Sequence, residues 1–113
     1  MDLETVDIGG DTHVISIHGR LDALGVDRLE AKFNAAVTVG SHHALVDLSR
    51  VDFIASLGLR MFIVAVRAGT RKGKQIVFFG AQPGVRQVLE HSAFEKIAPL
   101  AVDLPAARAL LSE

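Results

Sequence analysis

The sequence predicts an α/β protein with a mixed, mostly parallel sheet of about five strands and about four helices. Two observations predict this fold class. Short runs rich in β-branched and aromatic residues alternate with stretches whose apolar residues recur at helical spacing. Residues 44–48 are apolar with almost no alternation, which is typical of a strand covered on both faces by helices. The length of 113 residues and a hydrophobic content of 50% fit a single domain over residues 1–113.

The N-terminal segment predicts a β-hairpin. Residues 3–8 alternate loosely between polar and apolar types, and residues 12–18 are rich in β-branched types. Gly9-Gly10-Asp11 between them is typical of a hairpin turn. We expect Gly19-Arg20-Leu21-Asp22 to end the second strand. This hairpin would add an antiparallel edge to the sheet.

The next segment predicts a helix and a buried strand. Apolar residues recur at helical spacing from about Leu24 to Val39, and Gly40-Ser41 ends that helix. The apolar run 44–48 is the third strand. We expect a loop from Ser49 to Ala55 after it, which leads to Ser56 and the second helix.

The remaining elements alternate, as a parallel sheet requires. We expect a helix from Leu57 to about Arg71, a strand over 75–79 and a helix from Pro83 to about His91. A last strand over 97–102 and a terminal helix over 104–111 complete the chain, with Pro105 at the start of that helix. The predicted order is therefore β-β-α-β-α-β-α-β-α.

The composition excludes several classes of function. The chain has no Cys, so it forms no disulfide, thiolate zinc site or cysteine nucleophile. Its net charge of −1 and the absence of Trp and Tyr argue against a nucleic-acid partner. The most apolar stretch is too short to insert into a membrane, and the acidic N-terminus is unlike a secretory signal. We expect a cytoplasmic protein without a cofactor.

Ser56 lies just before an apolar helix, and two interpretations of its role there are compatible with each other. Its hydroxyl can act as the N-cap of that helix. A helix N-terminus also attracts anions through its free N–H groups and its dipole. A phosphate on Ser56 would add a charge of about −1.5 to −2 there. Modification of Ser56 could thus change the outer surface without unfolding the domain.

The helix after Ser56 predicts a surface for a protein partner. Arg60, Arg67 and Arg71 lie within about 20° of one line along the helix, and this polar stripe is expected to be its only water-facing side. Leu57 and Met61 lie beside the stripe and are expected to form an exposed apolar patch near Ser56. For Val64 and Ala68, core and surface positions remain equally open.

The segment from Asp47 to Leu59 resembles the STAS domains of bacterial anti-sigma factor antagonists. The hallmark of that family is a strand, an Asp-X-Ser-type loop and a Ser-X-Gly motif that opens a helix. The resemblance covers most of the chain in one order. The matching segments are Gly19-Arg20-Leu21-Asp22, Asp47-Leu48-Ser49, Val51-Asp52-Phe53-Ile54, Ser56-Leu57-Gly58-Leu59, Pro83-Gly84-Val85-Arg86-Gln87-Val88-Leu89 and Ser92-Ala93-Phe94.

The resemblance implies a regulatory binding protein and not an enzyme. In this family a serine kinase of the histidine-kinase-like ATPase type, itself the anti-sigma factor, binds the unphosphorylated protein and phosphorylates the serine, which breaks the complex. Ser56 would be the phosphorylated residue, a phosphatase would be a further partner, and the chain would be a monomer or weak homodimer. The partner-binding residues would be Asp22, Ser49, Asp52, Ala55, Leu57, Gly58, Arg60 and Met61.

Two residues depart from the family pattern. The family commonly has an acidic residue before the serine and a small polar residue after it, whereas this chain has Ala55 and Leu57. The lost acid makes the helix end less negative, which favours an incoming phosphate. It equally removes a group that the kinase could use to align the hydroxyl. The alternative function is a phosphorylation-independent STAS subunit of a lipid-transport ATPase complex.

Other groups of residues are weaker candidates for a catalytic or metal site. Ile54-Ala55-Ser56-Leu57-Gly58 is half of a nucleophile elbow, but Ile54 stands where the strained turn requires glycine. Asp22, Asp47 and Asp52 could hold Mg²⁺ at strand ends, although capping and turn roles explain each of them separately. The five His residues lack metal-ligand spacing. We therefore expect neither an enzyme nor a metal site.

Overall fold

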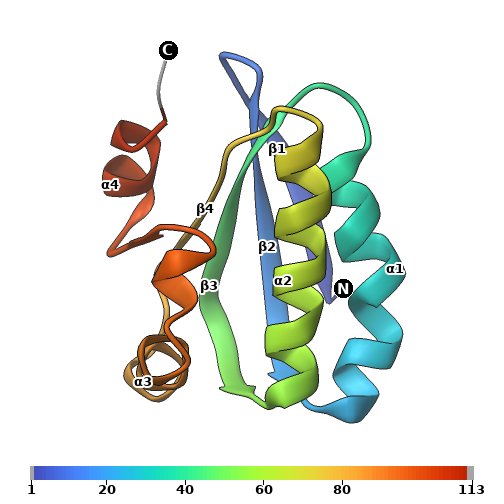
Figure 1. Cartoon of the computed structure of the whole chain (residues 1–113), viewed down its shortest axis with the longest axis vertical. Helices are drawn as coiled ribbons and strands as arrows, with labels where there is room; N and C mark the ends of the chain where they lie inside the picture. Colours follow the sequence, from blue (N-terminus) through green and yellow to red (C-terminus); the bar gives the residue numbers. More distant parts are fainter. Residues whose placement is uncertain (1, 112–113) are drawn as a thin grey trace.

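The structure is a computed structural model that describes residues 2–111. It confirms the predicted order of strands and helices and adds one short 3-10 helix, η1 (Figure 1). The elements are β1 Leu3–Gly9, β2 Thr12–Leu21, α1 Ala23–Thr38, β3 His43–Ile54, α2 Ser56–Arg71, β4 Ile76–Phe79, α3 Pro83–His91, η1 Phe94–Lys96, β5 Leu100–Ala101 and α4 Leu104–Ala109.

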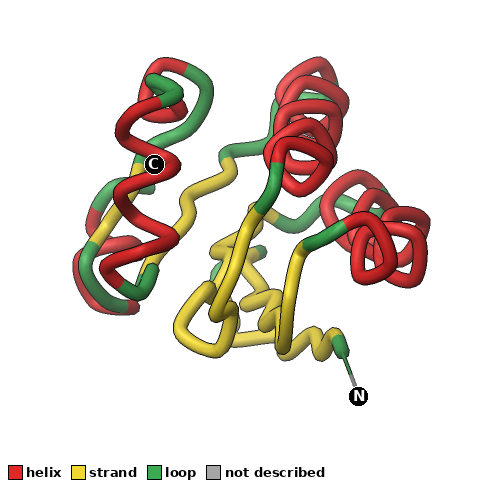
Figure 2. The backbone as a smooth tube through the Cα atoms, turned by 90° about the horizontal axis from the view of Figure 1, so that it is seen from below, coloured by secondary structure: helices red, strands yellow, loops and turns green. Residues whose placement is uncertain are grey.

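The five strands form one mixed sheet in the order β1-β2-β3-β4-β5. β1 pairs with β2 in the antiparallel sense, and the other three pairings are parallel, as predicted. Figures 1 and 2 show α1 and α2 side by side on one face of the sheet. α4 covers part of the opposite face, where Ala107 packs near Leu45 and Val77. The central strands are therefore buried on both faces.

Four phenylalanines form the centre of the main core. The ring of Phe62 on α2 lies 5.5 Å from that of Phe33 on α1, 4.8 Å from that of Phe78 on β4 and 6.0 Å from that of Phe94 on η1, measured between centroids. All four side chains are at most 1% exposed. Phe62 therefore joins both large helices to the sheet and to η1. Aromatic pairs at this range stabilise a fold beyond the effect of burying their surface.

β2 and β3 are longer than predicted. Residues 49–54 of the loop expected over Ser49–Ala55 are instead the second half of β3, and Gly19 does not end β2. The two strands stay paired as far as Leu21 and Ile54, and they absorb two register irregularities on the way. Gly19 has a φ of +105°, which a residue without a side chain adopts easily. Long-range pairing therefore overrides the local breaker signals that the sequence carries there.

The C-terminal region departs from the predicted strand over 97–102. Only Leu100–Ala101 pairs with β4. The residues before it turn tightly, because Phe94 O accepts hydrogen bonds from Ile97 N and Ala98 N at 2.8 and 3.0 Å. Ala93 starts this turn in the left-handed region with a φ of +56°. α4 begins at Leu104 as predicted and ends at Ala109, two residues early.

A buried histidine lies between the hairpin and α1. His13 is 9% exposed, and its ring stacks on His42 with the centroids 4.9 Å apart. His42 Nε2 lies 3.3 Å from Asp7 Oδ2. Burial lowers the pKa of His13, and the charges of His42 and Lys74 lower it further, although the Ala36 carbonyl and Asp7 act in the opposite direction. The surroundings of His13 therefore favour its neutral form.

We expect the domain to lose stability in mild acid because of His13. Its pKa is lower in the folded chain than in the unfolded chain, where it is about 6.5. The unfolded chain takes up this proton first, so the free energy of unfolding decreases below about pH 6.5, by at most about 1.4 kcal/mol per pH unit. Urea unfolding at pH 7.5 and 5.5 measures the decrease, which should shrink in His13→Leu. An equal decrease in both proteins would contradict this assignment.

Candidate functional site

Ser56 is the first residue of α2 and not its N-cap, so the predicted capping role is wrong. The N-cap is Ala55, whose backbone is extended and whose N–H donates to Leu21 O at 3.0 Å. The reason lies in the sheet: β3 stays paired with β2 through Ile54, so the chain turns into the helix at Ala55. Ser56 therefore lies within the first turn of α2, and its side chain does not cap the N–H groups of that turn.

The hydroxyl of Ser56 is accessible. Its side chain is exposed and has no hydrogen-bond partner among residues 2–111. The Ala55 methyl group cannot cap the helix, and the backbone N–H groups of Ser56 and Leu57 find no acceptor in the same described part of the chain. An uncapped helix start keeps its positive end open to an anion. The site thus combines a modifiable hydroxyl with a backbone that favours negative charge.

Asp22 lies beside this helix start. Leu21 pairs with Ile54 at the end of the sheet, which brings Asp22 next to Ala55. Asp22 Oδ1 accepts a hydrogen bond of 2.9 Å from Gly25 N and caps α1. That hydrogen bond is the main cause that lowers the pKa of Asp22. The carboxylate therefore has a structural role at α1 as well as its place at the edge of the site.

Arg20 and Phe53 also lie at the edge of the Ser56 site, and the sequence did not identify them as site residues. The guanidinium of Arg20 lies 4.4 Å from the ring centroid of Phe53 and 3.5 Å from Asp22 Oδ2. Phe53 is 39% exposed although it is a large apolar residue. Both residues lie in segments that the sequence analysis placed in turns or loops. Their contact arises only because β2 and β3 remain paired there.

Two of the predicted contact residues are buried. Met61 is 2% exposed and faces the core, so it does not extend the apolar patch. Gly58 is also buried, and a Cβ at this position would lie 2.9 Å from Ile54 Cγ1 and 3.0 Å from Leu21 Cβ. Its role is therefore to let α2 approach the end of β2. The glycine of the Ser-X-Gly motif positions Ser56 instead of offering a surface of its own.

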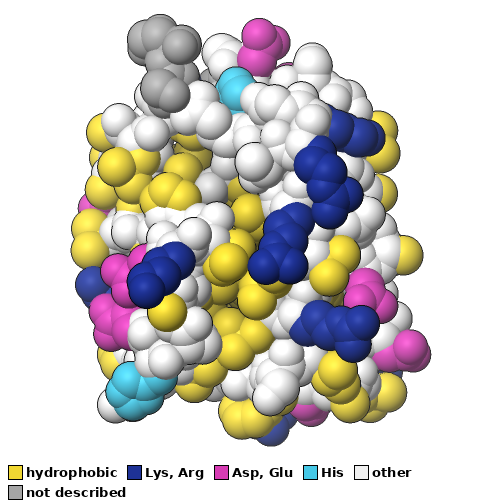
Figure 3. All heavy atoms as spheres, in the orientation of Figure 1, with side chains coloured by type: hydrophobic (Ala, Val, Ile, Leu, Met, Phe, Trp, Pro, Cys, Tyr) yellow, Lys and Arg dark blue, Asp and Glu magenta, His cyan; other side chains and the backbone are white. Residues whose placement is uncertain are grey.

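The exposed face of α2 is broader than the predicted arginine stripe. Leu57 is 46% exposed and Val64 51%, which places Val64 on the surface, whereas Ala68 is half-buried. Arg60, Arg67 and Arg71 are exposed, and none has an ion-pair partner within residues 2–111. Figure 3 shows dark-blue side chains along this helix with yellow ones between them. The face thus alternates positive and apolar groups.

Ser49 and Asp52 lie on β3, before Ser56 in the chain. Ser49 is exposed and is five residues from Ile54, roughly 17 Å along a strand. Its carbonyl accepts a hydrogen bond of 3.0 Å from Gln82 Nε2 just before α3. Asp52 is the extra residue of the bulge opposite Gly19 and Arg20, and it is exposed. Both side chains are accessible, but Ser49 is distant from Ser56.

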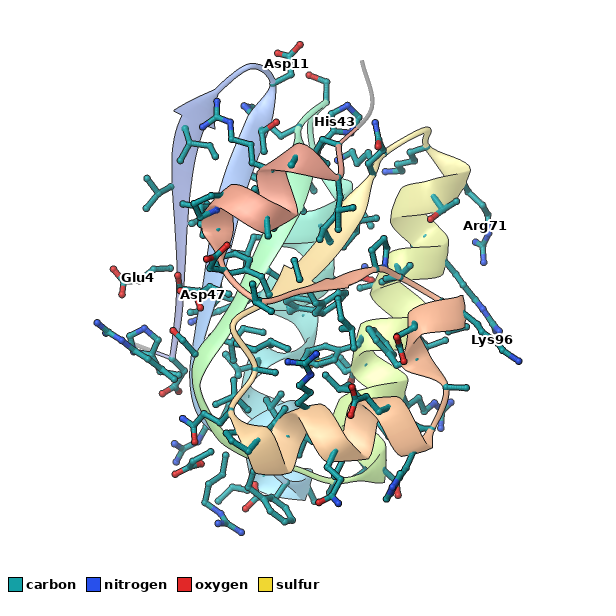
Figure 4. All side chains as sticks on the ribbon, turned by 90° about the vertical axis from the view of Figure 1, so that its left-hand side faces the viewer. Glu4, Asp11, His43, Asp47, Arg71 and Lys96 are labelled. Carbon is teal, nitrogen blue, oxygen red and sulfur yellow. The ribbon has the colours of Figure 1, made fainter. Side chains whose placement is uncertain are left out.

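The three aspartates considered for Mg²⁺ do not come together. Asp47 lies on β3 (Figure 4), where its Oδ1 accepts a hydrogen bond of 2.9 Å from Ser49 N, while Asp22 caps α1. Within residues 2–111, no group of three or more His, Asp or Glu side chains could hold a metal ion. In the same range, no helix has the length and apolar character needed to cross a membrane.

These features define a class of protein: a small α/β module whose exposed serine opens a surface helix. A family model described as Mlab, STAS domain, matches residues 4–110. BtrV of Bordetella bronchiseptica, described as an anti-sigma factor antagonist, is 31% identical over 96 residues, which cover 85% of this chain and 83% of BtrV. The chain belongs to the STAS-domain family of anti-sigma factor antagonists.

Solved structures support the same assignment at the level of the fold. An anti-sigma factor antagonist from Mycobacterium paratuberculosis is 25% identical, with a TM-score of 0.77 over 95% of this chain and 92% of that chain. The phosphorylated form of SpoIIAA from Bacillus is 20% identical, with a TM-score of 0.69 over 96% of this chain and 99% of that one.

Proposed function

We propose that this protein binds an anti-sigma factor through the surface around Ser56 and that phosphorylation of Ser56 breaks the complex. The observation that carries the proposal is the exposed, unbonded Ser56 hydroxyl at the uncapped start of α2. Asp22, Leu57 and Arg60 supply the surrounding contacts. In keeping with the STAS resemblance, the partner is a serine kinase of the histidine-kinase-like ATPase type, and a phosphatase restores the hydroxyl.

Phosphorylation acts through charge at this surface. The kinase transfers a phosphoryl group from ATP to Ser56 Oγ, which loses its proton. The product carries a charge of about −1.5 to −2. Arg60 lies one turn further along α2 and can pair with the phosphate. The dianion then opposes acidic groups of the partner and must be desolvated on docking. The protein itself acts as a regulator without catalysis, in the cytoplasm.

Ser56 variants test this function. With the anti-sigma factor purified from the source cell, Ser56→Ala should bind like the wild type, and Ser56→Asp should bind at least about tenfold more weakly, because like charges at an interface cost several kcal/mol. Titration calorimetry measures both affinities. The matched control is Ser41→Asp, an exposed serine before β3 at the other end of the molecule. Equal binding by wild type, Ser56→Ala and Ser56→Asp refutes the proposal.

A second function is favoured by the apolar groups on α2. Ala55 and Leu57 flank Ser56, and Leu57 and Val64 are about half exposed. Such a face suits a permanent interface that needs no phosphate, such as that of a STAS subunit in a lipid-transport ATPase complex. Stable copurification with an ATPase, together with an unmodified Ser56 by mass spectrometry, would support this function over the first.

A further inference from the structure

Three cationic side chains converge on one hollow at the far end of α2 from Ser56. Arg67 and Arg71 reach it from α2, and Lys96 reaches it from η1. Figure 4 shows Arg71 and Lys96 extending to the same side of the molecule. The hollow is open and has a volume of about 350 Å³. Its other lining residues are Val66, Thr70 and Ile97.

No negative group balances these cations inside the hollow. None of the six lining residues is acidic, and Arg67, Arg71 and Lys96 have no ion-pair partner within residues 2–111. Glu95 is exposed beside Lys96 in the chain but does not line the hollow. Arg67 and Arg71 are one helical turn apart, where like charges destabilise a helix. The helix dipole favours Arg71 in the last turn, and its effect fades before Arg67.

We propose that this hollow binds a ligand that carries clustered phosphate groups. The planar guanidinium groups of Arg67 and Arg71 match phosphate oxygens in bidentate geometry, and Lys96 adds a point charge. Thr70 supplies a hydroxyl donor. Val66 and Ile97 provide an apolar wall that excludes water from one side of the ligand. The site lies about 16 Å along α2 from Ser56, counted to Arg67, and it goes beyond the proposed docking surface.

Two sources share this chemistry: a free polyphosphate compound and the phosphates of neighbouring lipid headgroups at a membrane surface. Calorimetric titration with sodium tripolyphosphate tests the first source, with sodium chloride at the same ionic strength as the reference. Sedimentation with phosphatidylglycerol vesicles tests the second, with phosphatidylcholine vesicles as the reference. Saturable binding in either arm is the expected result, and the arm that responds identifies the source. The measurements use the full chain and need no knowledge of the anti-sigma factor.

Variants assign the binding to this hollow. Lys96→Gln and Arg67→Gln should each weaken the affinity about tenfold, the effect of one lost charge-assisted hydrogen bond. Arg108→Gln is the matched control, because Arg108 is exposed on α4 over the opposite face of the sheet. Unchanged thermal unfolding of each variant verifies that the fold is intact. Absence of binding in both arms, or equal weakening by Arg108→Gln, overturns the proposal.

Discussion

Phe62→Ala is expected to lower the free energy of unfolding by about 3–5 kcal/mol. Phe62 is fully buried, and its ring contacts those of Phe33, Phe78 and Phe94. Truncation leaves a cavity where α1, α2, β4 and η1 meet, and the three remaining rings cannot collapse into it without moving a whole element. A chain of this size has a stability of roughly 6–17 kcal/mol, so the loss is a large fraction of the total.

Phe53→Ala provides the comparison for Phe62→Ala. Phe53 is 39% exposed, and its ring contacts Arg20 at the surface. An exposed cation–π contact contributes about 0.5–1 kcal/mol, so the loss of stability should stay near that value. Chemical denaturation of both variants measures the difference. Similar losses for the two variants would contradict the central role assigned to Phe62.

Gly25→Ala is expected to destabilise the domain by about 3 kcal/mol, at the upper end of the range for overpacking. A Cβ at Gly25 would overlap the carbonyl oxygen of Arg20. That oxygen belongs to the backbone of β2 and cannot rotate away. The start of α1 must therefore shift, which also disturbs the hydrogen bond from Gly25 N to Asp22. Because Asp22 lies next to Ala55, the change should reach the Ser56 surface.

Gly84→Ala separates this steric effect from the general effect of adding a methyl group. Gly84 is the second residue of α3, and a Cβ there would meet nothing within 4 Å. Alanine favours helices over glycine by up to about 1 kcal/mol, so Gly84→Ala should leave stability unchanged or raise it. Thermal unfolding of both variants measures the contrast. A Gly25→Ala protein as stable as Gly84→Ala would show that α1 can move away from β2 at little cost.

Local patterns predicted the elements whose burial follows a simple period. The helix over Pro83–His91 has the predicted bounds, since Pro83 fits its first turn and Val85 and Leu89 face the core. The apolar run 44–48 is buried on both faces, as its lack of alternation indicated. The half of β3 after Leu48 was missed, because its exposed polar residues resemble a loop when its pairing with β2 is unknown.

At the candidate site, too, local patterns predicted some features and missed those that depend on tertiary contacts. Helical spacing placed Ser56 just before an apolar helix, one residue from its observed position as the first residue of α2, and it correctly placed Leu57 on the helix surface. It could not show that Met61 turns inward or that Val64 turns outward, since both are apolar and the orientation of α2 depends on what it packs against. The contact between Arg20 and Phe53 joins two strands, so no spacing within one segment could reveal it.

The sequence by itself determined the order of the elements, the single α/β architecture and the place of Ser56 at a helix start, because hydrophobic periodicity is a local property of the chain. Only the tertiary structure decided that Ala55 and not Ser56 occupies the N-cap position of α2, that Gly58 is a packing residue and that Lys96 lies beside Arg67 and Arg71. Each of these depends on the contact of segments distant in sequence. Such contacts form because folding buries apolar surface collectively, so the position of one segment depends on all the others.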